Sequence, residues 1–169
     1  SFNEKIQWLK LYNRIKNHSI LVDKYSVRKI IEKEIGSDYL IPLIGVYNSI
    51  SEINIDFLPK SFVIKTTHGS GMNIICLDKK LLDWENIKKI ISKWLSQNYY
   101  NVGREWIYKH IKPRILCEQL LLNNKDTEIY DYKFFCFGGK PLYIQVDVDR
   151  FSKHKRNFYD TNWNIQPFK

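Results

Sequence analysis

The fold of this chain is decided by the stretch FVIKTTHGSGMNIIC, Phe62–Cys76. It begins with a run of β-type residues that carries one lysine, Lys65, and it ends with a second apolar run. A short polar loop with two glycines lies between the runs. Because both runs favour strands, the pattern predicts two antiparallel strands joined by a glycine flap.

The residues of this flap suit a phosphate group. Gly69 and Gly71 can adopt positive φ and bring backbone N–H groups close to an anion. Lys65 adds a positive charge, and hydroxyl donors come from Thr66, Thr67 and Ser70. The stretch is not a P-loop, because Lys65 precedes the glycines and a strand follows them. Taken alone, an ordinary hairpin turn explains the stretch equally well.

The composition indicates a folded protein that prefers anionic partners. With 169 residues and 44% hydrophobic content the chain can bury a sizeable core, and its net charge is +9. Three cysteines, Cys76, Cys117 and Cys136, each lie among apolar residues, which predicts buried reduced thiols in a cytoplasmic protein. No apolar run is long enough to span a membrane.

Two helices are expected before the flap. The first begins at Asn3 and packs through a helical stripe of apolar residues. The second is capped by Asp23 and ends at Gly36, so Lys24 and Arg28 share a face near its N-terminus. An anion bound there and two solvated basic side chains are both consistent with this placement.

The elements after the flap complete an α+β pattern with antiparallel sheets and flanking helices. Asp83 caps an amphipathic helix, and Pro113–Leu121 reads as a buried strand in which Glu118 requires a partner. Residues 131–150 form a hairpin around Gly138-Gly139. The tail from His154 has no firm period. We divide the chain into residues 1–60, helical and linking, 61–117, which carry the flap, and 118–169, a second subdomain.

Four ordered motifs resemble the ATP-grasp proteins, and most closely their TupA-like branch, found in bacterial surface-polysaccharide loci. The motifs are Asp23-Lys24 at a helix start, FVIK with HGSG, Cys117-Glu118-Gln119-Leu120, and DYKFFCF from Asp131. The likeness extends from about residue 2 to residue 168. It implies a nucleotide cleft between two lobes built on antiparallel sheets.

The resemblance also implies roles for individual residues. Lys24 and Lys65 match the two lysines on the ATP phosphates, and His68, Gly69, Ser70 and Gly71 match the lid. Glu118, Gln119, Leu120 and Leu121 match the hinge, where backbone groups bind adenine and a carboxylate binds ribose. Lys133 and Arg150 fall where related ligases keep cations near the transferred phosphoryl group.

The family reaction joins a carboxylate to an amine through an acyl phosphate, with ATP and Mg²⁺ as cofactors. Asp147, Asp149 and Asn157 have suitable chemistry for the metal. Relatives usually continue with a further acidic strand pair, so we expect a C-terminal segment to be missing. The implied partners are a nucleotide and an anionic glycan or amino-acid substrate, without nucleic acid. The oligomeric state is not predicted.

Three other functions are weighed against this one. A kinase or glycan-modifying transferase would use the same lysine and flap. A basic nucleic-acid-binding module would use the aromatic and basic segment 99–112. A Cys–His nucleophile such as Cys117 with His68 has no supporting spacing.

Overall fold

The computed structural model describes residues 1–15, 17–122, 129–149 and 153–168. The chain forms two compact units, Ser1–Leu120 and Leu121–Lys169, and each is described by itself. The fold is α+β with antiparallel sheets, as the sequence predicts. None of the helices in the described ranges is long and apolar enough to cross a membrane.

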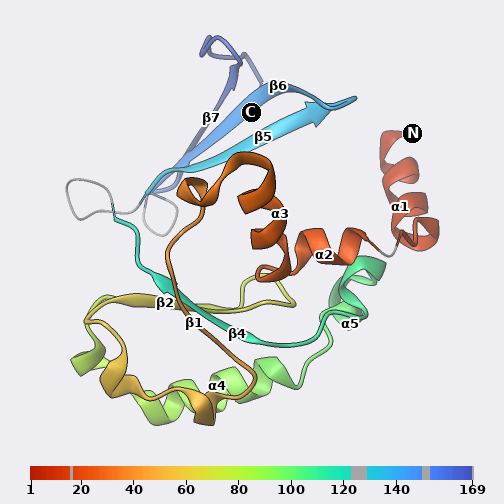
Figure 1. Ribbon diagram of the computed structural model, residues 1–169. Helices are drawn as coiled ribbons and strands as arrows, with labels where there is room; N and C mark the ends of the chain where they lie inside the picture. Colours follow the sequence, from red (N-terminus) through yellow and green to blue (C-terminus); the bar gives the residue numbers. More distant parts are fainter. Residues whose placement is uncertain (16, 123–128, 150–152, 169) are drawn as a thin grey trace. The chain divides into compact units, whose positions relative to one another are not determined.

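The first unit is built on a four-stranded antiparallel sheet in the order β1-β4-β2-β3 (Figure 1). Its strands are β1 (Leu43–Tyr47), β2 (Phe62–Thr66), β3 (Asn73–Cys76) and β4 (Ile115–Gln119). β2 pairs with β3 from Phe62↔Cys76 to Lys65↔Asn73, which confirms the two strands and the flap. On its other side β2 pairs with β4, and Val63 lies opposite Glu118.

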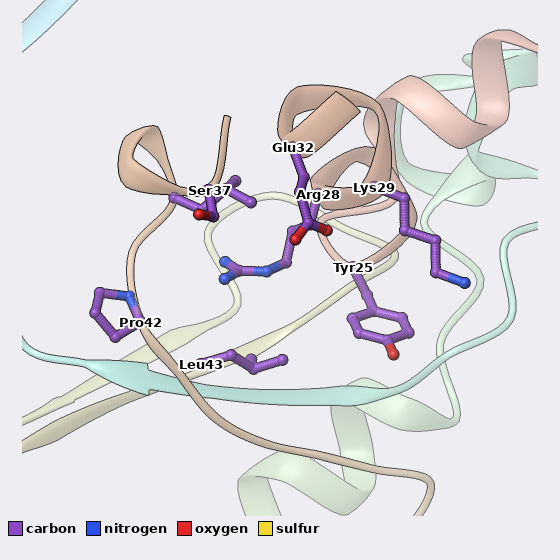
Figure 2. A pocket seen from close by; sticks show the side chains of 8 residues that line it. Tyr25, Arg28, Lys29, Glu32, Ser37, Pro42 and Leu43 are labelled. Carbon is purple, nitrogen blue, oxygen red and sulfur yellow. The ribbon is translucent and has the colours of Figure 1, made fainter. Parts of the chain in front are cut away.

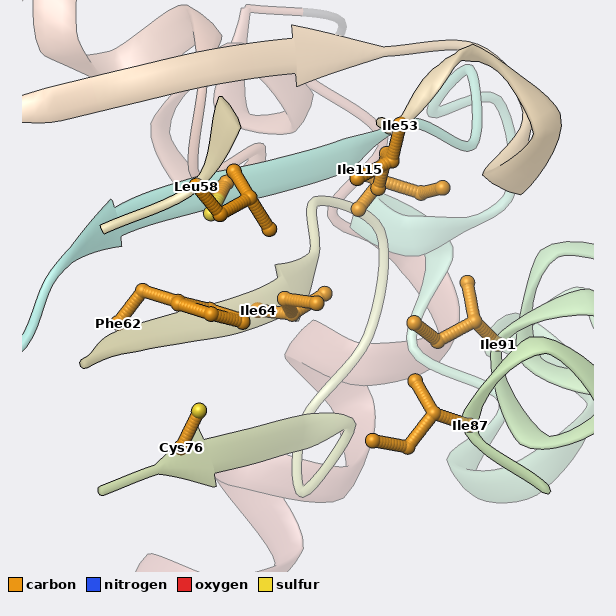
Figure 3. Packing of buried hydrophobic residues seen from close by; sticks show 9 residues of the cluster. Ile53, Leu58, Phe62, Ile64, Cys76, Ile87, Ile91 and Ile115 are labelled. Carbon is orange, nitrogen blue, oxygen red and sulfur yellow. The ribbon is translucent and has the colours of Figure 1, made fainter. Parts of the chain in front are cut away.

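One face of this sheet packs on helix α4 (Trp84–Leu95) to form the core. Asp83 caps α4 as predicted, because its side chain accepts the Asn86 N–H at 3.0 Å. Figure 3 shows Ile87 and Ile91 facing the side chains of the sheet. The fully buried side chains include Phe62 and Ile64, and each contributes about 1.5–3 kcal/mol by leaving water. This packing fixes β2 and therefore the position of Lys65.

Three helices precede the sheet: α1 (Phe2–Tyr12), α2 (His18–Val22) and α3 (Ser26–Ile35). α1 starts one residue earlier than expected, because Ser1 and Glu4 form a capping box. None of its residues is buried, so the expectation of a packing helix is wrong. α3 begins at Ser26, and the Asp23 carboxylate accepts the N–H groups of Tyr25 and Ser26.

Short elements connect these parts of the first unit. They are α5 (Tyr100–Gly103) and the 3₁₀ turns η1 (Ser37–Tyr39), η2 (Ile50–Glu52), η3 (Ile55–Phe57), η4 (Lys79–Leu81) and η5 (Trp106–Tyr108). η1 ends at Tyr39 and β1 starts at Leu43, so residues 40–42 connect them without forming a strand.

The second unit contains a three-stranded antiparallel sheet in the order β5-β6-β7. The strands are β5 (Asp131–Phe137), β6 (Lys140–Val148) and β7 (Lys155–Asp160). The predicted hairpin turns at Gly138 and Gly139, whose φ angles of 57° and 78° suit a two-residue turn that glycine adopts without strain. β7 occupies the tail in which the sequence shows no period.

The three thiols are free, but they do not share one environment. Cys76 and Cys117 are buried in the core of the first unit, as predicted. Cys136 is exposed, so that part of the prediction is wrong. The reason is its place next to the hairpin turn, where β5 exposes residues on both faces.

Candidate functional site

A buried carboxylate with two cations occupies the face of the first sheet opposite the α4 core. Glu118 on β4 accepts Lys65 Nζ of β2 at 2.7 Å on Oε2 and Arg28 Nη1 of α3 at 2.9 Å on Oε1. The Glu118 side chain is only 6% exposed. Lys65 is therefore held by an ion pair on its inner side, and Glu118 has the partners that the sequence argument required.

Arg28 also borders a pocket between α3, η1 and the start of β1. Its second terminal nitrogen donates to the Ile41 carbonyl at 2.7 Å, which fixes the guanidinium across the space (Figure 2). The pocket has a volume of about 410 Å³ and combines the charges of Arg28, Lys29 and Glu32 with the apolar side chains of Leu40, Pro42 and Leu43. A two-step ion-pair chain thus connects this pocket with Lys65.

Lys24 lies at the root of the flap. Its ammonium donates to the carbonyls of Thr66, at 3.1 Å, and Gly69, and its backbone N–H donates to the Thr67 carbonyl at 3.2 Å. Burial lowers the pKa of Lys24, and the charge of Lys65 lowers it further. The two lysines are therefore close enough to repel one another, and an anion bound between them would relieve that repulsion.

Asp23 and Arg114 hold Lys24 in this position. Arg114 donates to Asp23 Oδ2 at 2.7 Å, and its guanidinium lies 4.6 Å from the centre of the Tyr25 ring. The backbone N–H of Thr67 donates to the Arg114 carbonyl at 2.9 Å. The start of α3, the end of β2 and the approach to β4 are thereby joined at one point.

The flap is anchored at its base and open at its tip. His68 is 2% exposed, its Nε2 donates to the Trp94 carbonyl at 3.1 Å, and burial lowers its pKa, so the imidazole is neutral. Its Nδ1 is buried and has no hydrogen-bond partner among the described residues. Ser70 and Gly71 are exposed. His68 therefore secures the flap to α4, and the tip residues are the ones accessible to a ligand.

Two glycines of the flap are required for different reasons. A Cβ added at Gly69 would lie 2.8 Å from Met72 Sδ and 3.0 Å from Tyr99 Cδ2, so a larger residue would have to displace these two side chains. Gly71 faces open space but has a φ of 73°, which other residues adopt at a cost.

The predicted hinge residues lie at the end of β4. Gln119 is the last residue of the strand, and its backbone N–H donates a hydrogen bond to the Pro42 carbonyl at 3.0 Å. Leu120 and Leu121 follow outside any strand, at the division between the two units. Both carboxylate oxygens of Glu118 contact cations, so the structure assigns this side chain to Lys65 and Arg28.

The predicted residues of the second unit are only partly brought together. Lys133 Nζ contacts Asp147 Oδ2 at 2.5 Å and Asp131 Oδ2 at 2.7 Å, and these hydrogen bonds raise the pKa of Lys133. Asp149 is exposed beyond the end of β6 with a φ of 51°. Asn157 pairs with Val146, so it lies on the opposite face of the sheet from Asp147. Arg150 lies outside the described residues.

No metal centre is assembled in the described ranges, where no three His, Cys, Asp or Glu side chains gather in a way that could hold an ion. Instead, Asp147 accepts four side-chain donors, among them Arg156 and His154. Arg156 and His154 were not among the predicted site residues. Their signal in the sequence is the basic run at residues 153–156, which leads into β7.

The structure also describes the residues of the two alternative sites. Arg14 and Lys109 lie 4.7 Å and 4.8 Å from the centre of the Trp106 ring, so cations of the chain itself pack on this aromatic residue. Burial raises the pKa of the Cys117 thiol to about 12, so it carries no thiolate near neutral pH.

Comparison with known proteins places the chain among the ATP-grasp proteins. The family model described as TupA-like ATPgrasp matches residues 4–169, and the chain belongs to this family. The resemblance drawn from the four motifs is thereby confirmed. No curated protein and no solved structure matches the chain.

Proposed function

We propose that this protein binds ATP through Lys24, Lys65 and the flap tip, and that it activates a carboxylate for ligation to an amine. The observation that carries the proposal is the position of two lysines at the base of the glycine flap. Lys24 donates to the carbonyls of Thr66 and Gly69, and Lys65 lies on β2 directly before Thr66. A polyphosphate is the ligand that such a pair favours, because charge-assisted hydrogen bonds to both ammonium groups would replace the repulsion.

The residues present fit the nucleotide. Lys65 and Lys24 would hold phosphate oxygens, and the exposed N–H and hydroxyl groups of Ser70 and Gly71 would cover them. His68 anchors the flap through the Trp94 carbonyl. Glu118 orients Lys65 through their ion pair, and it remains the proposed acceptor for a ribose hydroxyl. Backbone groups of the hinge, from Gln119 to Leu121, would bind adenine.

Lys133 and Arg150 remain the proposed cations near the transferred phosphoryl group. ATP acts with Mg²⁺ in this proposal, but Asp147 does not fit the metal because its carboxylate is saturated by cationic and amide donors. We therefore assign no protein ligand to Mg²⁺. A cytoplasmic location, a role in surface-polysaccharide synthesis and an anionic glycan or amino acid as substrate complete the proposal.

Calorimetric titration with a non-hydrolysable ATP analogue tests the binding step. Lys65→Ala should weaken binding by about 1.5–3 kcal/mol, the usual worth of a hydrogen bond to a charged group. Lys60→Ala is the matched control, because the Lys60 side chain is 78% exposed and lies just before β2. An affinity for the analogue that is the same in Lys65→Ala and in the control would show that the site is misplaced.

Product analysis tests the reaction. A ligase releases ADP and free phosphate while it joins carboxylate and amine, whereas a kinase leaves the phosphoryl group on its acceptor. Phosphate found on the acceptor at the end of the reaction would replace the ligase by the kinase.

A further inference from the structure

The middle strand of the second sheet, β6, carries a carboxylate that binds cationic side chains from both neighbouring strands. The side chain of Asp147 on β6 is fully buried, with 0% exposed. Its Oδ2 accepts Lys133 Nζ of β5 at 2.5 Å and Gln145 Nε2 at 2.6 Å. Its Oδ1 accepts Arg156 Nε of β7 at 2.7 Å and His154 Nε2 at 2.8 Å.

This arrangement excludes a divalent cation at Asp147. A carboxylate offers about four lone-pair positions, and four donors already occupy them. The hydrogen bonds from Arg156 and Lys133 hold the pKa of Asp147 well below its usual range. A metal ion would have to displace these donors and would then lie beside positive charges.

The three side chains that surround Asp147 reach solvent. Lys133, His154 and Arg156 are 40%, 39% and 46% exposed, whereas the carboxylate between them is not. Arg156 contacts Asp147 through Nε, so within the described ranges its two terminal nitrogens keep their four N–H donors. Lys133 bonds two carboxylates and keeps its third N–H. Donors are therefore available on the solvent side of a fixed cluster.

We propose that Lys133, Arg156 and His154 form a receptor for an oxyanion, a phosphoryl or carboxylate group, and that Asp147 holds them in register. The planar Arg156 fork suits two oxygens of one such group, and Lys133 supplies its third N–H donor beside it. The assignment of this oxyanion to a substrate of the ligase rests on the proposed function. The presence of an oxyanion receptor does not depend on that function.

Anion titration of the whole chain tests the receptor at low ionic strength. Inorganic phosphate and acetate are the two probes, and amide and imidazole NMR shifts report binding near His154. Arg156→Gln and Lys133→Gln should each weaken binding of the preferred probe about tenfold, as loss of a charged hydrogen bond predicts. Lys140→Gln, which removes an exposed charge from the hairpin end of β6, should leave it unchanged. Tighter phosphate binding assigns a phosphoryl group, and tighter acetate binding assigns a carboxylate.

Two results would overturn the receptor. One is an affinity for both probes that neither Arg156→Gln nor Lys133→Gln alters. The other is Mn²⁺ binding by the wild-type chain that Asp147→Asn abolishes while circular dichroism shows an intact fold. The nucleotide titration of Lys65→Ala is independent of these measurements. If Lys65→Ala leaves nucleotide affinity unchanged while phosphate still binds as predicted, the ATP site is wrong and the oxyanion receptor is retained.

Discussion

Replacing Glu118 with glutamine should destabilise the first unit strongly while it preserves the shape of the side chain. Glu118 is 6% exposed, and its two partners, Arg28 and Lys65, are 15% and 25% exposed. Loss of the central charge leaves both cations without a counter-ion in a mostly desolvated place. Breaking a buried ion pair from one side costs about 3–5 kcal/mol.

The expected value is at the lower end of that range, about 3 kcal/mol. Arg28 keeps its hydrogen bond to the Ile41 carbonyl in the variant. A quarter of the Lys65 side chain already reaches water, so its ammonium can turn outward and recover part of its hydration. Both effects reduce the cost of the lost charge without removing it.

The chain supplies a matched control in Glu85→Gln. Glu85 contacts Lys88 at 2.7 Å, the same distance as between Glu118 and Lys65, but its side chain is 76% exposed. An exposed pair of this spacing on a helix contributes about 0.3–0.5 kcal/mol. The two substitutions therefore differ in burial and not in the length of the ion pair.

Urea unfolding followed by tryptophan fluorescence measures both variants, and Trp84 and Trp94 report on the core of the first unit. The midpoint should fall clearly for Glu118→Gln and barely for Glu85→Gln, at similar urea dependence. A loss below about 1 kcal/mol for Glu118→Gln would refute the reasoning that this carboxylate is the buried anchor of two cations.

Three further predictions concern thiols, acid and the flap. With an aromatic disulfide reagent at mild alkaline pH, the exposed Cys136 should react rapidly. Cys117 should react only after unfolding, because burial raises the pKa of its thiol to about 12. Rapid reaction of two thiols in the native chain would contradict this. The pKa of Asp147 is lower in the folded chain than its ordinary 3.8, so its stabilisation is fully present well above that value and is lost progressively as pH falls from about 4 toward the pKa of the folded chain. In thermal unfolding, the difference between wild type and Asp147→Asn should therefore start to shrink near about pH 4 and continue to shrink at lower pH. A constant difference would count against the cation cluster. His68→Ala should cost about 2 kcal/mol in urea unfolding and increase proteolysis within the flap, and an unchanged cleavage rate would remove His68 as its anchor.

The strands around the flap were predictable because their information is local. The alternation of strand and turn residues from Phe62 to Cys76 sets both strands and their pairing within one segment. The same holds for the hairpin at Gly138-Gly139 and for the helix that Asp83 caps. In each case the turn or cap residue and the apolar pattern agree on one structure.

The partners of the charged residues were not predictable, because they are distant in sequence. Glu118 is 53 residues from Lys65 and 90 residues from Arg28, so its need for a counter-ion could be argued but not assigned. The place of His68 beside the glycines predicted a lid residue, and its hydrogen bond to the Trp94 carbonyl of α4, 26 residues away, could not be predicted. β7 was missed because its residues pair with β6 without an apolar alternation of their own.

Both sheets use one buried carboxylate to fix cations before any ligand arrives. Glu118 fixes Lys65 and Arg28, and Asp147 fixes Lys133 and Arg156. A flexible lysine or arginine loses rotamer freedom when it grips an anion, and a side chain that is already held loses less of it then. Glu118 compensates one of its two cations, so a positive charge remains available to a ligand there. At Asp147 the second carboxylate, Asp131, also pairs with Lys133, so what remains available is the set of unused N–H donors on Arg156 and Lys133. Because the ordering cost is met when the chain folds, removal of either carboxylate should weaken anion binding even though it removes a negative charge, which is the opposite of what simple charge counting predicts.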